Sequence, residues 1–373
     1  MLLCLAGDVM TGRGIDQVLA QPSRPVLFEP HVRDARNYVA LAERANGAIA
    51  APVADDYVWG DALAVLERLQ PAARIVNLET AVTAADDAWR GKSIHYRMHP
   101  ANVGCLGVAR IDVCTLANNH VLDWGRDGLD ETLHTLHRAG LRTAGAGHDL
   151  DEASAPAELP LAGGGRLLVF ARADDRCGVL PAWSATARRA GVALLPELSH
   201  ATAQRLAEQV QQHRRPGDLV VVSVHWGDNW VAEVPLEHRA FAHALIDLQA
   251  ADLVHGHSSH HPLPAEVYRG KLILYGCGDL INDYEGIASR GELRSDVGCL
   301  WLPLLERDTG RLRRLRIEPM QLRRLRLQLA DADARRFVEA LLDRRGRWPG
   351  TWLEALDDGG WVLRTPGPME AAA

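Results

Sequence analysis

The chain has 373 residues, of which 47% are hydrophobic and 24% are charged, and its formal net charge is −7 at pH 7. This composition is typical of a globular protein with a large core. The negative charge argues against a nucleic-acid or other polyanion binder. Apolar runs stay short of the roughly 20 residues that a membrane span needs, so we expect no membrane anchor, and no signal peptide is recognisable.

The six cysteines are scattered along the chain without a Cys-x-x-Cys pair, and several lie in apolar runs. Free thiols are commonly buried in such runs, so we expect no disulfide framework. A chain with reduced thiols is typical of a reducing compartment, and we therefore expect a cytoplasmic location.

Short apolar runs alternate with amphipathic helical patterns along the chain. Residues 21–60 are irregular and rich in proline and glycine, and we expect an insertion on the active-site side. Helices are predicted at 128–139 and 236–250, where apolar residues recur at i, i+3, i+4 and i+7. The run at 218–224 is nearly continuous and contains four valines, as in a strand covered on both faces. Strands are predicted at 2–6, 74–76, 111–116, 166–171, 219–224, 252–254 and 271–275. This alternation predicts an α/β fold with a central sheet.

The last part of the chain follows a different pattern. The segment 311–327 carries two arginine-rich repeats. We favour a pair of edge strands with arginines facing solvent over an anion-recognition patch. A helix is predicted at 332–345 and a closing segment at 348–361, followed by a tail expected to be disordered. We therefore divide the chain into a domain of residues 1–330 and a C-terminal helix and closing segment at 331–373.

Residues that bind metals follow most of the predicted strands. In chain order these are Asp8, Asn77-Leu78-Glu79, Asn118-Asn119-His120, His225, the cluster His255-Gly256-His257-Ser258-Ser259-His260-His261, and Gly278-Asp279. In open α/β sheets the carboxyl ends of strands form one ligand-binding edge. Oxygen and imidazole ligands suit divalent metals, whereas a structural zinc site would use cysteines. Each residue alone could be a helix cap or a buried histidine, but the ordered set predicts a metal site.

The order of these motifs resembles the CapA family of capsule or poly-γ-glutamate synthesis proteins, which belongs to the calcineurin-like metallophosphoesterase superfamily. The most specific segments are Leu116-Ala117-Asn118-Asn119-His120, with Asp123 and Gly125 after it, and His225-Trp226-Gly227. The resemblance implies a metallophosphoesterase-like αββα sandwich with its metal site at the carboxyl ends of the strands.

The resemblance also implies a role for each matching residue. The metal ligands would be Asp8, Glu79, Asn119, His225, His257 and His260, with Glu79 in the place of the bridging carboxylate. His120 would protonate a leaving group or hold an oxyanion, near its working pKa, with Asp123 orienting its ring. Of the remaining histidines, His255 is expected to be a strand or supporting residue, and His261 to face solvent or substrate.

The chain departs from the family pattern at three places. Met10 stands where the superfamily has the histidine of an Asp-x-His motif, which leaves open whether one or two divalent ions bind. Manganese, zinc, iron and nickel are equally compatible with the residues. Ser258-Ser259 replaces the usual His-Pro of the loop. Asp279 replaces an asparagine, and its carboxylate could bind metal or select a cationic group of the substrate.

Three functions are compatible with these residues. We favour a metal-dependent phosphoesterase, with a metal-activated hydroxide as nucleophile and His120 as acid. The second is chemistry on amide or γ-glutamyl bonds, because Arg13, Lys92 and Arg97 could clamp carboxylates, although solvation alone would explain each of them. With Asp279, these three are the substrate-binding candidates.

The third is a non-catalytic accessory protein of polyglutamate or capsule synthesis. Met10 favours this function, because a catalytic metal site that has lost one of its ligands can lose its activity. The expected partner is a small-molecule or peptide-like anionic substrate. The sequence leaves the oligomeric state open.

Overall fold

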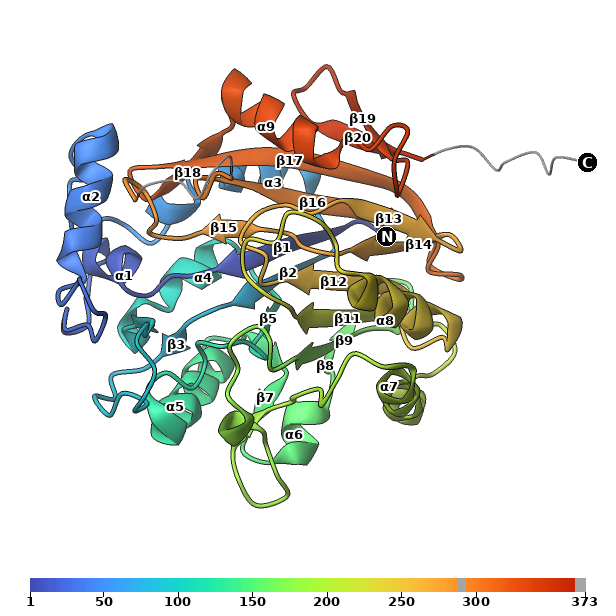
Figure 1. Cartoon of the computed structure of the whole chain (residues 1–373), viewed down its shortest axis with the longest axis horizontal. Coiled ribbons are helices and arrows are strands. Elements are labelled where there is room, and N and C mark those ends of the chain that lie inside the picture. The colour runs from blue at the N-terminus through green and yellow to red at the C-terminus, as the bar shows by residue number, and fades with distance from the viewer. Residues whose placement is uncertain (288–292, 366–373) are drawn as a thin grey trace, which may run out of the picture.

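The computed structural model describes residues 1–287 and 293–365 and consists mainly of two β-sheets that face each other (Figure 1). The larger sheet has ten strands in the order β19-β20-β17-β16-β1-β2-β5-β6, with β15 paired to β1 and β18 paired to β17. The smaller has six strands in the order β13-β14-β12-β11-β9-β8. Two short two-stranded sheets pair β3 (Ala81–Val82) with β4 (Arg97–Met98) and β7 (Ala146–Gly147) with β10 (Gly191–Val192).

The ten-stranded sheet joins a parallel half to an antiparallel half at β1. Its strands are β1 (Leu3–Val9), β2 (Ala73–Leu78), β5 (Val113–Thr115), β6 (Arg142–Ala144), β15 (Asp279–Ile281), β16 (Val297–Leu305), β17 (Leu312–Arg323), β18 (Arg326–Leu329), β19 (Trp352–Ala355) and β20 (Trp361–Arg364). Strand β1 runs parallel to β2 and β15 and antiparallel to β16. The carboxyl end of β1 is therefore held from both sides.

The six-stranded sheet presents its buried strands to two different cores. It comprises β8 (Ala157–Pro160), β9 (Arg166–Ala173), β11 (Leu219–His225), β12 (Leu253–His257), β13 (Ala265–Tyr268) and β14 (Lys271–Leu274). Strands β9, β11, β12 and β14 run parallel to one another, and the edge strands β8 and β13 are antiparallel to β9 and β14. In β11, Val220 and Val222 belong to the outer core, whereas Leu219 and Val221 belong to the core that reaches the other sheet. Because side chains alternate along a strand, His225 faces inward as well.

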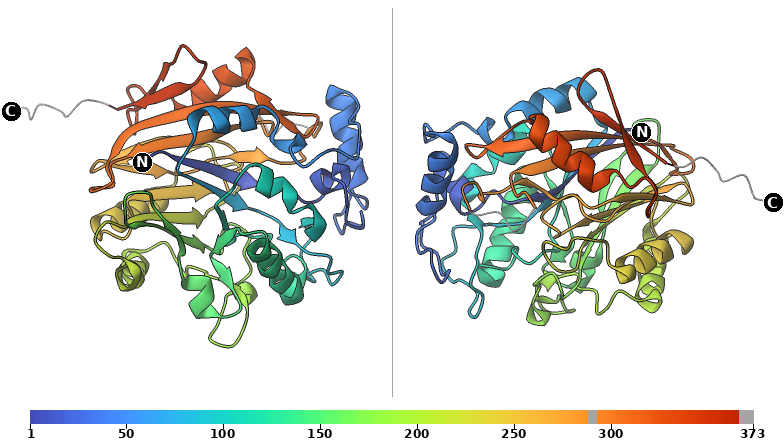
Figure 2. Two further views of the ribbon diagram at one scale, coloured as in Figure 1. Left: turned by 180° about the vertical axis from the view of Figure 1, so that it is seen from behind. Right: turned by 45° about the horizontal axis from the view of Figure 1, so that its top comes forward.

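Helices lie against the outer sides of the two sheets (Figure 2). Helices α7 and α8 cover the six-stranded sheet, and α3, α5 and α9 pack on the ten-stranded sheet. The helices are α1 (Gly14–Val18), α2 (Arg36–Asn46), α3 (Asp61–Leu69), α4 (Gly104–Val108), α5 (Gly125–Arg138), α6 (Leu150–Ser154), α7 (His200–His213), α8 (Leu236–Asp247) and α9 (Ala332–Leu342). The short 3₁₀-helices are Tyr57–Trp59, Pro100–Asn102 and Pro181–Trp183. This arrangement confirms the predicted αββα sandwich.

The arginine-rich segment corrects one expectation. Strand β17 is not an edge strand, because β16 lies on one side of it and β20 and β18 on the other. Arg316 is buried and donates to Glu318, whereas Arg313 and Arg314 are exposed. The reason is a long-range pairing: β20, from the closing segment, adds along β17, and a local charge pattern carries no information about it.

The C-terminal part packs on the same large sheet through α9, β19 and β20. The domain division at residue 330 stays a prediction. The tail that we expect to be disordered includes residues 366–373, which lie outside the described residues.

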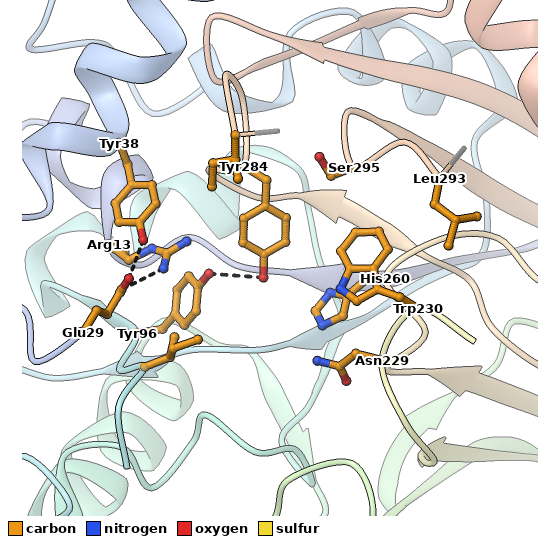
Figure 3. Close-up of a pocket in the computed structure, with 12 residues that line it drawn as sticks. Arg13, Glu29, Tyr38, Tyr96, Asn229, Trp230, His260, Tyr284, Leu293 and Ser295 are labelled. Atoms are coloured by element: carbon orange, nitrogen blue, oxygen red, sulfur yellow. Dashed lines mark hydrogen bonds and ion pairs between the residues drawn. The ribbon is translucent and has the colours of Figure 1, made fainter. Parts of the chain in front are cut away.

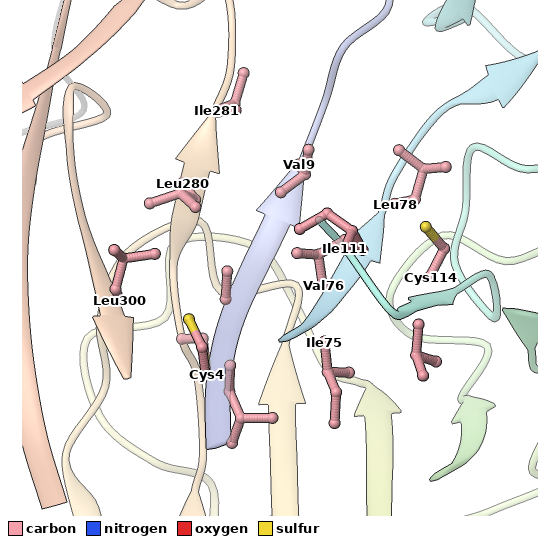
Figure 4. Packing of buried hydrophobic residues seen from close by; sticks show 14 of the residues in the cluster. Cys4, Val9, Ile75, Val76, Leu78, Ile111, Cys114, Leu280, Ile281 and Leu300 are labelled. Carbon is pink, nitrogen blue, oxygen red and sulfur yellow. The ribbon is translucent and has the colours of Figure 1, made fainter. Parts of the chain in front are cut away.

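The apolar core surrounds β1 and its parallel neighbours (Figure 4). Leu5 is fully buried and lies opposite Ile75 of β2 and Trp301 of β16. Side chains of the same core extend from β1 toward its carboxyl end, where the polar residues begin. The core therefore fixes the strand that carries Asp8.

We expect Leu5→Ala to lower the free energy of unfolding by about 2–5 kcal/mol, because it leaves a cavity that the rigid surroundings cannot close. The matched control is Leu329→Ala, since Leu329 is 59% exposed and its loss should change stability by less than about 0.5 kcal/mol. Urea unfolding of both variants measures the difference. Equal effects would contradict a core centred on β1.

Candidate metal centre

Two groups of buried potential metal ligands share Asp8 at the carboxyl ends of the strands. In the first group, Asp8 Oδ1 lies 3.9 Å from His225 Nδ1 and 3.7 Å from His257 Nδ1. The two Nδ1 atoms are 2.7 Å apart. At this distance one ring donates an N–H to the other, so both nitrogens face the same point beside the Asp8 carboxylate. These three ligand atoms lie close enough together to bind one metal ion.

The second group consists of Asp8, His260 and Asp279. Asp279 opens β15 directly beside Asp8, and its Oδ1 lies 2.8 Å from His260 Nδ1. His260 follows β12 in a loop where Ser258 and His260 adopt φ values of 87° and 59°. Residues other than glycine rarely adopt this left-handed conformation, and it is concentrated at functional sites.

The backbone around Asp8 is shaped to turn its carboxylate inward. The pairing of β1 shifts register next to Asp8 on both sides, as at a β-bulge, which redirects a side chain. Gly7 is required there, because a Cβ would lie 1.9 Å from the carbonyl oxygen of Gly278. Asn77 Nδ2 donates to Asp8 Oδ1 at 2.7 Å and the Ser258 amide donates to Oδ2 at 3.2 Å.

Three buried carboxylates, those of Asp8, Glu79 and Asp279, gather at this site. Within residues 1–287 and 293–365 none of them forms an ion pair with lysine or arginine, and neither oxygen of Glu79 has a hydrogen-bond partner. Burial, with the charge of Asp279, raises the pKa of Asp8 to about 7. Burial, with Asp8 and Asp279, raises the pKa of Glu79 well above its usual range. A buried unpaired carboxylate is costly, and a bound cation removes that cost.

The histidines are in the state that a metal needs. Burial lowers the pKa of His225 and of His257 well below the usual range, so both rings are neutral at neutral pH. Neutral imidazoles together with carboxylates are the donor set of zinc, manganese, iron and nickel sites. The residues therefore fit a divalent metal. Asn119 adjoins them, with its Oδ1 3.1 Å from His225 Nε2.

His120 faces the carboxylates from the adjoining loop. Its Nδ1 lies 2.6 Å from Asp123 Oδ2, and its Nε2 lies 3.7 Å from Glu79 Oε1. Lys92 Nζ lies 3.0 Å from His120 Nδ1 and 2.5 Å from Asp123 Oδ1. Burial, and then the charge of Lys92, lowers the pKa of His120 to about 4, below the near-neutral value expected for a general acid. His120 is therefore neutral at rest, with Nε2 directed at the ligand groups.

The three predicted cationic clamps do not form one cluster. Arg13 is buried and bonded to Asp283 and Glu29. Lys92 contacts His120 and Asp123, as described above. Arg97 is bonded to Asp86 and to the carbonyl of Ala85, and its guanidinium lies over Trp124. Each cation already has protein partners, and carboxylate clamping by them stays a prediction.

Of the remaining histidines, His255 lies on β12 and contacts the carbonyl of Ala6 through Nε2, as expected of a supporting residue. The expectation for His261 is wrong. Its ring is fully buried, and Nε2 contacts the carbonyl of Val231 while Nδ1 contacts that of Pro262. The loop after β12 folds inward and satisfies this ring with backbone oxygens, which spacing alone could not show.

A pocket of about 220 Å³ opens beside the second ligand group (Figure 3). His260 lines it, and Trp230 is stacked on the His260 ring with centroids 5.2 Å apart. Residues 21–60, expected to form an insertion on this side, contribute Glu29 and Tyr38. The other lining residues are Arg13, Ile94, Tyr96, Asn229, Tyr284, Ile287, Leu293 and Ser295.

Sequence reasoning missed the aromatic lining. Trp230 follows the His225-Trp226-Gly227 motif closely, and Tyr284 follows Asp279, so proximity to site motifs was the available signal.

The fold and site define an αββα protein with a candidate metal centre between its sheets. The chain belongs to the family of bacterial capsule synthesis protein PGA_cap, which matches residues 2–284. This confirms the CapA family that the motifs predicted.

Among its relatives, a probable polyglutamine synthesis accessory protein of Mycobacterium tuberculosis is 44% identical over 344 residues, covering 92% of this chain and 90% of that protein. The PGA biosynthesis protein CapA of Bacillus subtilis is 26% identical over 316 residues, covering 82% and 68%. A crystal structure described as a novel phosphatase of Mycoplasma pneumoniae has a TM-score of 0.45 and 11% identity, covering 86% and 93%.

Two further findings concern the cysteines and the helices. The six cysteines are free and buried. In the part of the chain that the structure describes, every helix is too short or too polar to cross a membrane.

The His225-Trp226-Gly227 turn is packed against a buried histidine of α8. His238 stacks on Trp226 with ring centroids 4.5 Å apart, and a Cβ on Gly227 (φ 72°) would lie 2.5 Å from its ring. Neither nitrogen of His238 has a hydrogen-bond partner among the described residues. Burial lowers the pKa of His238 to about 3.

This shift predicts acid sensitivity. Because the folded pKa of His238 is below its ordinary value of 6.5, the unfolded chain takes up the proton first, and stability falls as the pH drops below 6.5. From about pH 7.5 to about pH 5.5 this histidine should cost about 1.4 kcal/mol. In His238→Phe, which keeps a ring on Trp226, the fall measured by urea unfolding should be smaller by that amount. An unchanged fall would contradict the assignment.

Proposed function

We propose that this protein is a metal-dependent hydrolase of phosphoesters. The observation that carries the proposal is the pair of ligand groups that share Asp8, with the Glu79 carboxylate beside them lacking a hydrogen-bond partner among the described residues. Asp8, His225 and His257 would hold one divalent ion, and Asp8, His260 and Asp279 a second. Asp279 thereby supplies a ligand on the side where Met10 leaves the superfamily's histidine missing.

A divalent ion in such a site supplies Lewis acidity toward a phosphoryl oxygen and toward water. The chain's own residues orient the reaction. His120 presents Nε2 toward the carboxylates and would hydrogen-bond the leaving oxygen, while Asp123 fixes its ring. Lys92 holds Asp123 and lowers the pKa of His120. The low pKa favours the neutral ring, so hydrogen bonding to an oxyanion is the role that we assign to His120 at rest.

A second candidate is an accessory role in polyglutamate assembly, with or without chemistry on a γ-glutamyl bond. The names of the relatives favour it, since one is a polyglutamine synthesis accessory protein and another a PGA biosynthesis protein. The existing partners of Arg13, Lys92 and Arg97 argue against a carboxylate clamp at this site. A cytoplasmic location remains part of the proposal and is supported by the free cysteines.

The two ligand groups predict the metal count. After loading with manganese and desalting, elemental analysis should find two ions per chain in the wild type. Asp279→Ala should leave one, and Asp8→Ala should leave none, because Asp8 belongs to both groups. Protons and cations compete for Asp8, whose pKa is raised to about 7, so affinity should rise with pH. The control is His200→Ala on the exposed start of α7. Two ions in Asp8→Ala would contradict the shared site.

The proposed role of His120 predicts that its replacement lowers turnover without changing metal binding. His120→Gln should lower kcat for phenyl phosphate by about 10²–10⁴-fold while the metal content stays unchanged. His225→Ala and His257→Ala should lose both turnover and metal. Steady-state kinetics with elemental analysis measure the two quantities. Absence of turnover in the manganese-, zinc-, iron- and nickel-loaded wild type would remove the proposed function and leave the accessory role.

A further inference from the structure

We propose that the pocket beside His260 binds a flat aromatic or apolar group of the substrate, so that the site selects small ring-bearing esters over polyanionic chains. This inference names the substrate class and rests on the proposed function. The pocket adjoins the second ligand group through His260, whose ring both contacts Asp279 and lines the pocket. A substrate with one group bound in the pocket would therefore place its phosphoester at the metal ligands Asp8, His260 and Asp279.

Five of the twelve described residues that line the pocket carry rings. Trp230 lies nearly parallel to the His260 ring, at an interplanar angle of 17°. Tyr38, Tyr96 and Tyr284 line the opposite part (Figure 3). The hydroxyl of Tyr38 donates to Glu29 and that of Tyr96 to Tyr284, so these polar ends already have partners. Aromatic walls of this kind recognise flat rings by stacking and edge contacts.

The charged side chains that line the pocket within the described parts of the chain are already paired with protein groups. Arg13 is the one arginine among the described residues that line it, and no lysine lines it. Its guanidinium donates through Nε and Nη2 to Asp283 and through Nη1 to Glu29. It also lies 3.7 Å from the centroid of the Tyr38 ring. Two carboxylates thus surround one guanidinium, and among the described lining residues a chain of glutamate side chains would find no unpaired lysine or arginine.

The size and the opening of the pocket agree with a small ring-bearing substrate. A volume of about 220 Å³ accommodates one ring system. Ile94 and Ile287 line it and are each 42% exposed, which gives the opening an apolar rim. Exposed aliphatic side chains at a pocket mouth favour entry of an apolar group.

The test compares two phosphonates that carry the same anionic head, benzylphosphonate and ethylphosphonate, by titration calorimetry on the manganese-loaded protein. Benzylphosphonate should bind at least about tenfold more tightly, because only its ring reaches the aromatic walls. In Trp230→Ala this ratio should fall toward one, and in Trp230→Phe, which keeps a ring, most of it should remain. Trp352→Ala, on β19, is the matched tryptophan control. If Trp230→Ala fails to fold, Ile94→Ser at the rim should also lower the ratio.

Turnover of phenyl phosphate, measured separately, distinguishes this inference from the proposed function. A preference for benzylphosphonate without turnover supports the pocket and removes the hydrolase. Turnover with equal affinity for the two phosphonates overturns the pocket and keeps the hydrolase. The inference is also overturned if neither phosphonate binds, or if a γ-glutamate oligomer displaces benzylphosphonate at equal concentration.

Discussion

The site depends on the burial of three carboxylates without a lysine or arginine partner in the described part of the chain. Water is excluded from Asp8, Glu79 and Asp279, so a bound cation would balance their negative charge. Burial, with the charge of Asp279, raises the pKa of Asp8 to about 7, so protons compete with a cation for this carboxylate. Neutral His225 and His257 beside it supply the nitrogen ligands that a divalent ion prefers.

The cations near the site show how the fold keeps that negative charge unbalanced. Arg13 is bound by Glu29 and Asp283, Lys92 by Asp123, and Arg97 by Asp86. Each holds a loop or a side chain in place, and none is aimed at Asp8. Positive charge at the centre must therefore come with a ligand or an ion.

The local patterns of the chain predicted the strands and therefore the edge at which the ligands meet. The apolar run before His225 and the position of Asp8 after the first strand were sufficient for that. The sequence placed Asp279 at the same edge as Asp8, but it did not predict their direct pairing, because β15 adds to β1 between segments far apart in the chain. His261 was misplaced for a related reason: its partners are backbone oxygens of Val231 and Pro262, which leave no mark in a motif.

The ligands belong to two different sheets, and this has a mechanical consequence. Asp8 and Asp279 lie on strands of the ten-stranded sheet, whereas His225 and His257 end strands of the six-stranded sheet. An ion bound to both sets would link the two sheets and resist their sliding over each other. Metal binding would then stabilise the whole sandwich, and metal loss would weaken the interface between the sheets even at positions far from the substrate.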